Sequence, residues 1–277
     1  MKPLKRYLRQ PLGVIGAALA VALILMAALG PWLAPYDTGT ADYSQQWRPP
    51  GRAHWLGTEL YGVDVLSRII AGARMTLAIG LGASLLTVVI GMAFGVLAGY
   101  AGGRTDLLVS RLVDVTLAFP GLLLVMVLAA ALGRAAGTMT AVLLSLALVN
   151  WAPVAQLVRG QVLALKGREF VTASRALGAS HARLLLRHIL PNCLSVLLVV
   201  FTMRLGTTIL AEASLGFLGL GVSDQNSWGY LVKQYYEDPM HWWSSVFPAT
   251  AIALTVIAFN LVGDALRDAL DPKLRIR

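Results

Sequence analysis

Charged residues, cysteines and histidines are scarce in this sequence of 277 residues, and each scarcity excludes a class of protein. Charged types make up 13% of the chain, against about 25% in an ordinary soluble domain, which leaves too little charge to cover a soluble surface. The single cysteine, Cys193, excludes an internal disulfide and belongs to no redox or metal motif. The four histidines are scattered along the chain and predict no metal site. No glycine is followed by a lysine, so a phosphate-binding P-loop is excluded.

Hydrophobic residues, by contrast, reach 57% and come in blocks long enough to cross the roughly 30 Å hydrocarbon core of a bilayer. We therefore predict an all-α polytopic membrane protein with six transmembrane helices. A net charge of +9 would suggest nucleic acid in a soluble protein, but basic cytoplasmic loops explain it here. We expect the lipid bilayer, and no nucleic acid, as a partner. The predicted spans are residues 12–33, 77–99, 115–133, 138–158, 193–213 and 246–263.

The distribution of basic residues predicts the orientation of these spans. With the N-terminus inside, sixteen of the 23 lysines and arginines fall in cytoplasmic segments, six fall in outer segments, and Arg204 lies in a span. This asymmetry follows the positive-inside rule, so we expect both termini and the loop 159–192 in the cytoplasm. A cleaved signal peptide would also begin with basic residues, but the apolar run from Val14 to Leu33 exceeds the roughly 7–15 residues of a signal core.

Two outer segments are long enough to have structure. In residues 34–75, the apolar face from Val65 to Ala73 predicts a short helix lying on the membrane surface. In residues 221–245, we interpret the aromatic side chains as interfacial anchors, with direct contact to a solute as the alternative. These aromatic residues are Trp228, Tyr230, Tyr235, Tyr236, Trp242 and Trp243.

Glycines recur at every fourth position around the end of the second span. They are Gly91, Gly95, Gly99 and Gly103. Small residues at this spacing allow a second helix to approach closely, so the pattern predicts helix packing within the chain or with a partner subunit.

The longest cytoplasmic loop, 159–192, has the pattern of a helix, a break and a second helix. A small-to-apolar face is formed by Phe170, Ala173, Ser174 and Leu177. Gly178 is predicted to end the first helix in a left-handed conformation, and Ser180 to cap the next one. Pro191 suits the first turn of the fifth span. Such a short helix fits either a groove on a cytoplasmic partner or the membrane surface.

This stretch resembles the cytoplasmic coupling loop of ABC importer permeases. Their pattern is Glu-Ala-Ala, three residues, Gly, nine residues and then Ile-x-Leu-Pro. Ala173, Gly178, Leu190 and Pro191 match this pattern, whereas Thr172, Ser174 and His188 depart from it. The resemblance implies contact with an ATPase through Phe170, Thr172, Ala173, Ser174, Leu177, Gly178, Leu190 and Pro191.

Further stretches resemble the dipeptide, oligopeptide and nickel importer family, in its second type of permease subunit. They are residues 54–68, 212–221 with 227–229, and 260–272. The first departs from the family at Glu59, usually Asp, and at Val63, usually Arg. The resemblance implies the type I ABC importer permease fold in a bacterial inner membrane. It divides the chain into an N-terminal part, 1–76, and a core permease domain with five transmembrane helices, 77–277.

The same resemblance implies that the chain works in a complex. Its expected partners are a sister permease, two cytoplasmic ATPase subunits and an extracytoplasmic solute-binding protein. Because this sequence has no P-loop, the partner ATPases would bind ATP and Mg²⁺, and this chain would hold no cofactor. We expect a transport subunit and not an enzyme.

Only Arg204 and Glu212 are charged within or at the edge of a predicted span, where charge is a functional hypothesis by default. Arg204 is predicted either to face the translocation path and attract a carboxylate or to make a structural contact, and Glu212 is its companion candidate. A self-sufficient secondary transporter would need ion sites and repeats, and a membrane metallohydrolase would need clustered ligands; the sequence shows neither. Peptides are the expected substrate, with nickel or a metal chelate as the alternative.

Overall fold

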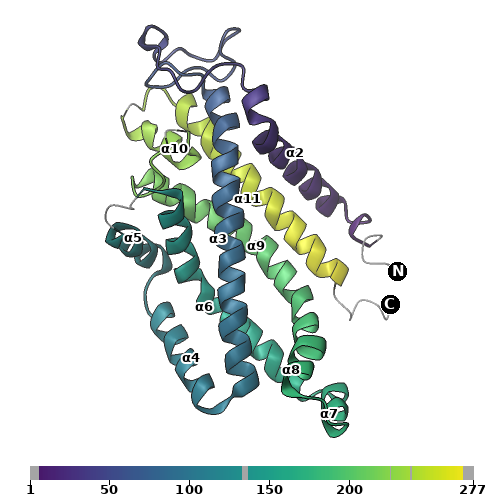
Figure 1. Cartoon of the computed structure of the whole chain (residues 1–277). Helices are drawn as coiled ribbons and strands as arrows, with labels where there is room; N and C mark the ends of the chain where they lie inside the picture. The colour runs from purple at the N-terminus through teal and green to yellow at the C-terminus, as the bar shows by residue number, and fades with distance from the viewer. Residues whose placement is uncertain (1–5, 133–136, 225, 238, 271–277) are drawn as a thin grey trace.

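The computed structural model describes residues 6–132, 137–224, 226–237 and 239–270, and it is helical throughout (Figure 1). Within these ranges there is no β-strand, only an isolated bridge between Thr58 and Asp64. The helices are α2 (Pro11–Leu33), η1 (Tyr43–Gln45), α3 (Val65–Ala101), α4 (Gly103–Leu117), α5 (Gly121–Ala131), α6 (Met139–Lys166), α7 (Glu169–Ala176), α8 (His181–Arg183), the π-helical η3 (Leu184–Ile189), α9 (Leu190–Phe217), α10 (Trp228–Glu237) and α11 (Trp243–Leu270).

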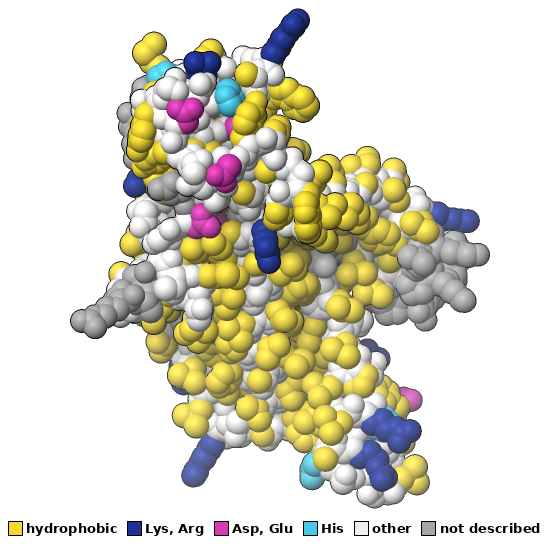
Figure 2. Space-filling model, turned by 45° about the horizontal axis from the view of Figure 1, so that its top comes forward, with side chains coloured by type: hydrophobic (Ala, Val, Ile, Leu, Met, Phe, Trp, Pro, Cys, Tyr) yellow, Lys and Arg dark blue, Asp and Glu magenta, His cyan; other side chains and the backbone are white. Residues whose placement is uncertain are grey.

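Five long apolar helices can cross a membrane, and the bent pair α4–α5 makes a sixth span when it is counted as one. The five are α2, α3, α6, the continuous helix His181–Phe217, and α11. The all-α polytopic prediction is therefore confirmed. Large apolar side chains such as Leu25, Leu85 and Leu198 are more than half exposed on the bundle surface. Figure 2 shows this surface as a broad yellow field, which suits contact with lipid.

The prediction of a separate surface helix between Val65 and Ala73 is wrong. These residues form the first turns of α3, which continues unbroken for 37 residues to Ala101. Its N-terminus is capped by Asp64, whose carboxylate accepts a hydrogen bond from the Ser67 N–H at 2.8 Å. The apolar face that suggested contact with lipid packs instead against protein, because Val65 and Ala73 join a buried cluster with α10 and α11. At about 1.5 Å per residue, α3 is roughly 55 Å long.

The span predicted over 115–133 falls on a bent pair of helices. It consists of α4 and α5, whose axes differ by 92°. The bend precedes α5 at Pro120, which has no N–H and disfavours helical backbone at Phe119. Since α5 has 11 residues, or about 16 Å, it reaches only halfway across the hydrocarbon core by itself.

The glycine repeat packs α3 against α6 of the same chain. A Cβ added at Gly95 would lie 2.6 Å from the carbonyl oxygen of Ala155, and one at Gly91 would lie 2.6 Å from Val154. Gly99 similarly faces the backbone of Arg159. Gly103 is the exception, because nothing lies within 4 Å of its added Cβ. The predicted helix packing is thus present within the chain, at three of the four glycine positions.

The segment 34–64 and α10 form a cap at one end of the bundle (Figure 1). Trp228 and Trp243 are buried beneath it, and their indole N–H groups donate to the carbonyls of Ile69 and Thr58 at 2.9 and 3.0 Å. Their interpretation as interfacial anchors is therefore wrong, whereas the half-exposed Trp242 fits it. The side chains of Tyr235 and Tyr236 lie outside the described part of the chain.

A buried ion pair joins this cap to α3. The guanidinium of Arg68 donates to Oε1 of Glu59 at 3.1 Å, and the amide of Gln234 donates to Oε2 at 2.7 Å. All three residues are buried. The carboxylate therefore ties the segment 34–64 to α3 and to α10 at once.

Helices α2 and α11 lie side by side, so the two described ends of the chain are neighbours. A Cβ added at Gly13 would lie 2.4 Å from the Cβ of Ala265, and Gln10 donates to Asp268 at 3.3 Å. Helix α7 lies at the end of the bundle opposite the cap (Figure 1). The basic residues Lys2, Lys5, Lys273, Arg275 and Arg277, which contributed to the predicted orientation, lie outside the described ranges.

Candidate coupling segment and intramembrane polar site

The predicted helix, break and helix are present between residues 167 and 190. Helix α7 covers Glu169–Ala176 and turns a single buried residue, Val171, toward the bundle. The predicted small-to-apolar face points outward, since Phe170 is 43% exposed and Leu177 is 88% exposed. Large apolar side chains at this exposure on a short helix form a surface that a partner can cover.

Gly178 has the left-handed conformation that the sequence predicted, with φ of +84°. After it, the hydroxyl of Ser180 accepts a hydrogen bond from the N–H of Arg183 at 3.3 Å and caps the next helix. That helix passes without a break through η3 into α9, so the fifth span begins at His181 rather than near residue 193. A change in the tilt of α9 therefore reaches the turn at Gly178 directly.

The three departures from the coupling-loop pattern are internally bonded. The hydroxyl of Thr172 donates to the carbonyls of Arg168 and Glu169, one turn back on its own helix. Ser174 and His188, which replace two apolar residues of the pattern, meet at 3.4 Å between Oγ and Nε2. This contact joins α7 to η3. The sequence could not predict it, because the two residues lie 14 positions apart and on different helices.

Leu190 and Pro191 begin α9 and lie apart from the exposed face of α7. Leu190 is half-buried and packs on the apolar cluster formed by α3, α6 and α9, while Pro191 is exposed. Their place indicates a role in starting the span. Direct contact with a partner stays a prediction for all eight residues.

Polar contacts that the sequence did not predict hold this end of the bundle together. The ammonium of Lys166 donates to the carbonyl of Tyr100 at 2.8 Å, and the Tyr100 hydroxyl bonds Nδ1 of His181 at 2.8 Å. Asp106 accepts two hydrogen bonds from Arg159, one of them at 2.7 Å. The end of α3 is thus tied to both sides of the α7 segment.

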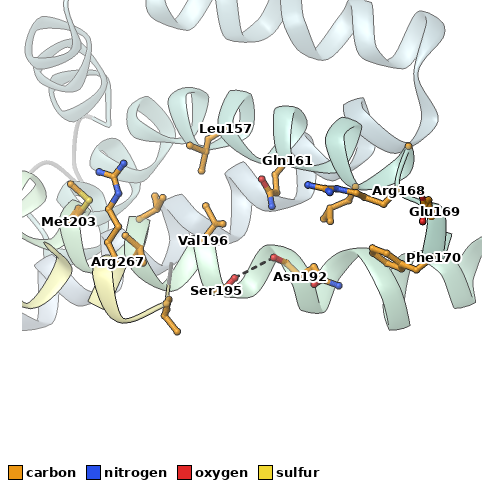
Figure 3. A pocket seen from close by; sticks show the side chains of 15 residues that line it. Leu157, Gln161, Arg168, Glu169, Phe170, Asn192, Ser195, Val196, Met203 and Arg267 are labelled. Atoms are coloured by element: carbon orange, nitrogen blue, oxygen red, sulfur yellow. Dashed lines mark hydrogen bonds between the residues drawn. The ribbon is translucent and has the colours of Figure 1, made fainter. Parts of the chain in front are cut away.

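A groove of about 1140 Å³ extends from α7 along the bundle between α6, α9 and the end of α11 (Figure 3). Its floor is formed by α9, from Asn192 to Met203. Polar side chains lie among the apolar ones, and Arg168, Glu169 and Arg267 are charged. The polar uncharged lining residues are Gln161, Asn192 and Ser195.

Arg204 and Glu212 do not meet. The guanidinium of Arg204 is half-buried and donates to the amide oxygen of Asn150 on α6 at 3.3 Å. Glu212 is fully buried and accepts from the hydroxyl of Ser227, just before α10, at 3.1 Å. In this conformation Glu212 is a structural contact between α9 and the cap, and its place on a path stays a prediction. Asn150 was missed, although a polar residue inside an apolar span is a signal that could have found it.

No group of three or more histidine, cysteine or carboxylate side chains that could hold a metal occurs in the part of the chain that the structure describes. The arrangement contains a short helix with exposed apolar side chains, a groove and an arginine within an apolar helix. These features suit movement of a solute better than bond-breaking chemistry.

Residues 91–276 match the family described as binding-protein-dependent transport system inner membrane component. Residues 4–50 match the N-terminal transmembrane domain of oligopeptide transport permease C. The chain is 40% identical over 277 residues to the oligopeptide transport system permease protein OppC of Bacillus subtilis (strain 168), covering 98% of this chain and 88% of that protein. It is 38% identical to the dipeptide transport system permease protein DppC of the same strain, and the match covers 98% of this chain and 85% of that protein. It is 42% identical to the glutathione transport system permease protein GsiD of Escherichia coli O157:H7, and the match covers 98% of this chain and 89% of that protein.

Two solved structures share the fold. A chain of the inward-facing MetNI methionine ABC transporter superposes with a TM-score of 0.62 at 22% identity, covering 74% of this chain and 98% of that one. A chain of an amino acid ABC transporter with histidines superposes with a TM-score of 0.58 at 18% identity, covering 75% of this chain and 99% of that one. At these identities the likeness concerns the fold alone, which is that of ABC importer permeases.

Proposed function

Because this chain belongs to the family of binding-protein-dependent transport system inner membrane components, we propose that it forms half of the translocation path of an ATP-driven importer of short peptides. It is a permease subunit, and not an enzyme. The observation that carries the substrate class is the set of full-length relatives, which are named for oligopeptides, dipeptides and glutathione. Nickel stays the second candidate from the sequence, but no relative reported above is named for it.

The proposed complex contains a sister permease, two cytoplasmic ATPases that bind ATP and Mg²⁺, and an extracytoplasmic binding protein. The outward face of α7 would lie in a groove on one ATPase, because Phe170 and Leu177 leave large apolar surface uncovered. Closure of the ATPase pair would then move α9 through its unbroken connection to η3. A rigid-body change of this kind is a common way to switch a membrane path between its two faces.

Uptake by the complete complex tests this function. We expect proteoliposomes that contain both permeases and both ATPases to accumulate a labelled dipeptide or tripeptide when ATP is inside and the binding protein is outside. A non-hydrolysable ATP analogue is the control and should give no accumulation. Uptake of a nickel chelate without uptake of any peptide would transfer the proposal to the second candidate.

The proposed orientation places α7 in the cytoplasm and the cap outside, at the inner membrane of a bacterium. Single cysteines at Ser180 and Ser223, both exposed, test it in a Cys193→Ala background. An impermeant thiol reagent added to intact cells should label the cysteine at 223 and leave the one at 180 unlabelled until the membrane is opened. Labelling of both cysteines in intact cells would reject the orientation.

A further inference from the structure

Arg204 is a cation within a membrane-spanning helix that has no anionic partner among the residues the structure describes. Its guanidinium donates a hydrogen bond to the neutral amide of Asn150. Glu212, the other charged side chain of α9, accepts a hydrogen bond from Ser227. It lies two turns further along the helix. A charge at this depth is costly unless an opposite charge or water compensates it. The compensating group must therefore come from outside the described part of this chain.

The Asn150 amide orients the guanidinium but accepts only one of its N–H groups. Its oxygen accepts one N–H from Arg204, and its own NH₂ donates to the carbonyl of Leu146 at 2.8 Å. A guanidinium has five N–H donors in a planar fork, so further donors stay free for a second group. Two parallel N–H donors match the two oxygens of a carboxylate.

The groove lies close to this pair along both helices. Val200 lies one helical turn from Arg204 on the same face of α9, and it lines the groove. Leu157 lies two turns from Asn150 on the same face of α6, and it also lines the groove. The groove thus approaches the pair along α9 and extends from there toward α7.

We propose that Arg204, held by Asn150, binds the C-terminal carboxylate of the transported peptide on its way through the membrane. This proposal rests on the proposed function and adds the chemical group that the path recognises. We place the carboxylate on the solute and not on the sister permease, because the pair lies beside a groove with polar side chains in its lining. A permanent ion pair would leave the partly polar groove unexplained.

The test compares a dipeptide with its C-terminal amide in reconstituted complexes that share one binding protein. Each peptide is supplied at a concentration that saturates that protein, and the ratio of acid uptake to amide uptake is measured. We expect Arg204→Gln to lower this ratio about tenfold, mainly by slowing the acid. Asn150→Ala should lower it severalfold, since the charge remains but its orientation is lost. Arg204→Lys should retain part of the preference, and Thr207→Val, on the same helix, should keep the parental ratio.

Each other outcome speaks against the proposal. An unchanged ratio in both Arg204→Gln and Asn150→Ala overturns it. If Arg204→Gln fails to assemble and Asn150→Ala keeps the parental ratio, Arg204 pairs with a carboxylate of the sister permease. A parent complex that takes up acid and amide equally also overturns it, whereas a parent complex that takes up no peptide overturns the proposed function itself.

Discussion

Gly178→Val is expected to abolish peptide transport while the importer still assembles. Gly178 has φ of +84°, a backbone conformation that strains a β-branched residue by about 1–2 kcal/mol or more. Nothing lies within 4 Å of a Cβ at this position, so the strain comes from the backbone alone and not from a clash. Relief of that strain changes the angle between α7 and the helix that leads into α9. Transport should fall at least tenfold, and ATP hydrolysis should no longer rise when peptide is supplied.

Two variants separate backbone strain from other effects at this turn. Gly178→Asn should stay close to the parent, because asparagine tolerates the left-handed conformation. Gly167→Ala adds a methyl group to the same loop in open space and at an ordinary φ of −88°, and it should also be neutral. The measurements are peptide uptake and peptide-stimulated ATP hydrolysis in proteoliposomes. Parental values for Gly178→Val would mean that this turn does not couple the two processes.

Glu59→Ala is expected to destabilise the protein more than any single change at its surface. The substitution leaves the buried guanidinium of Arg68 without its carboxylate, and breaking a buried ion pair in this way costs about 3–5 kcal/mol. It also removes the acceptor for the amide of Gln234. The cap should separate from α3, and little monodisperse complex should survive detergent extraction and mild heating.

A double variant and a surface control sharpen this prediction. Glu59→Leu combined with Arg68→Met removes both charges, and it should recover much of the stability because no charge is left buried alone. Asp37→Asn changes an exposed carboxylate of the same cap and should behave like the parent. Equal heat resistance of Glu59→Ala and the parent would show that the ion pair contributes nothing to the cap.

The sequence predicted the membrane helices well because their signal is a property of single segments. An apolar run of about 20 residues predicts a span whatever its neighbours are. Five of the six predicted spans correspond to long unbroken helices, and the third corresponds to the bent pair α4–α5. The local geometry of the coupling segment was predictable for the same reason. A left-handed Gly178 and a capping Ser180 depend on the residues beside them.

The failures concern features that depend on partners distant in the sequence. The face from Val65 to Ala73 has the same pattern whether lipid or protein covers it, and only the fold shows that α10 and α11 do. The indole of Trp228 finds its acceptor 159 residues away, so its burial could not be inferred from its aromatic neighbours. The pairs Glu59–Arg68 and Ser174–His188 likewise appear only when the chain is folded.

The bend of the third span is an intermediate case. Pro120 was visible in the sequence, and a proline that follows a helical segment can end it or merely kink it. Hydrophobicity alone predicted a span over 115–133 and gave no information on a bend within it. The 92° bend therefore required the packing of α4 and α5 against their neighbours to be known.

The unbroken length of α3 has a mechanical consequence. The helix is anchored at the cap by Arg68 and near its opposite end by Tyr100, and it runs unbroken for 37 residues from Val65 to Ala101. A rod of this kind behaves as a lever, because it has no joint in which a displacement could be absorbed. Rotation by about 5° around one end moves the other by roughly 5 Å, about one helical turn. In the proposed orientation, pressure on the cap and displacement of the loop at the opposite end of the bundle are therefore two ends of one movement.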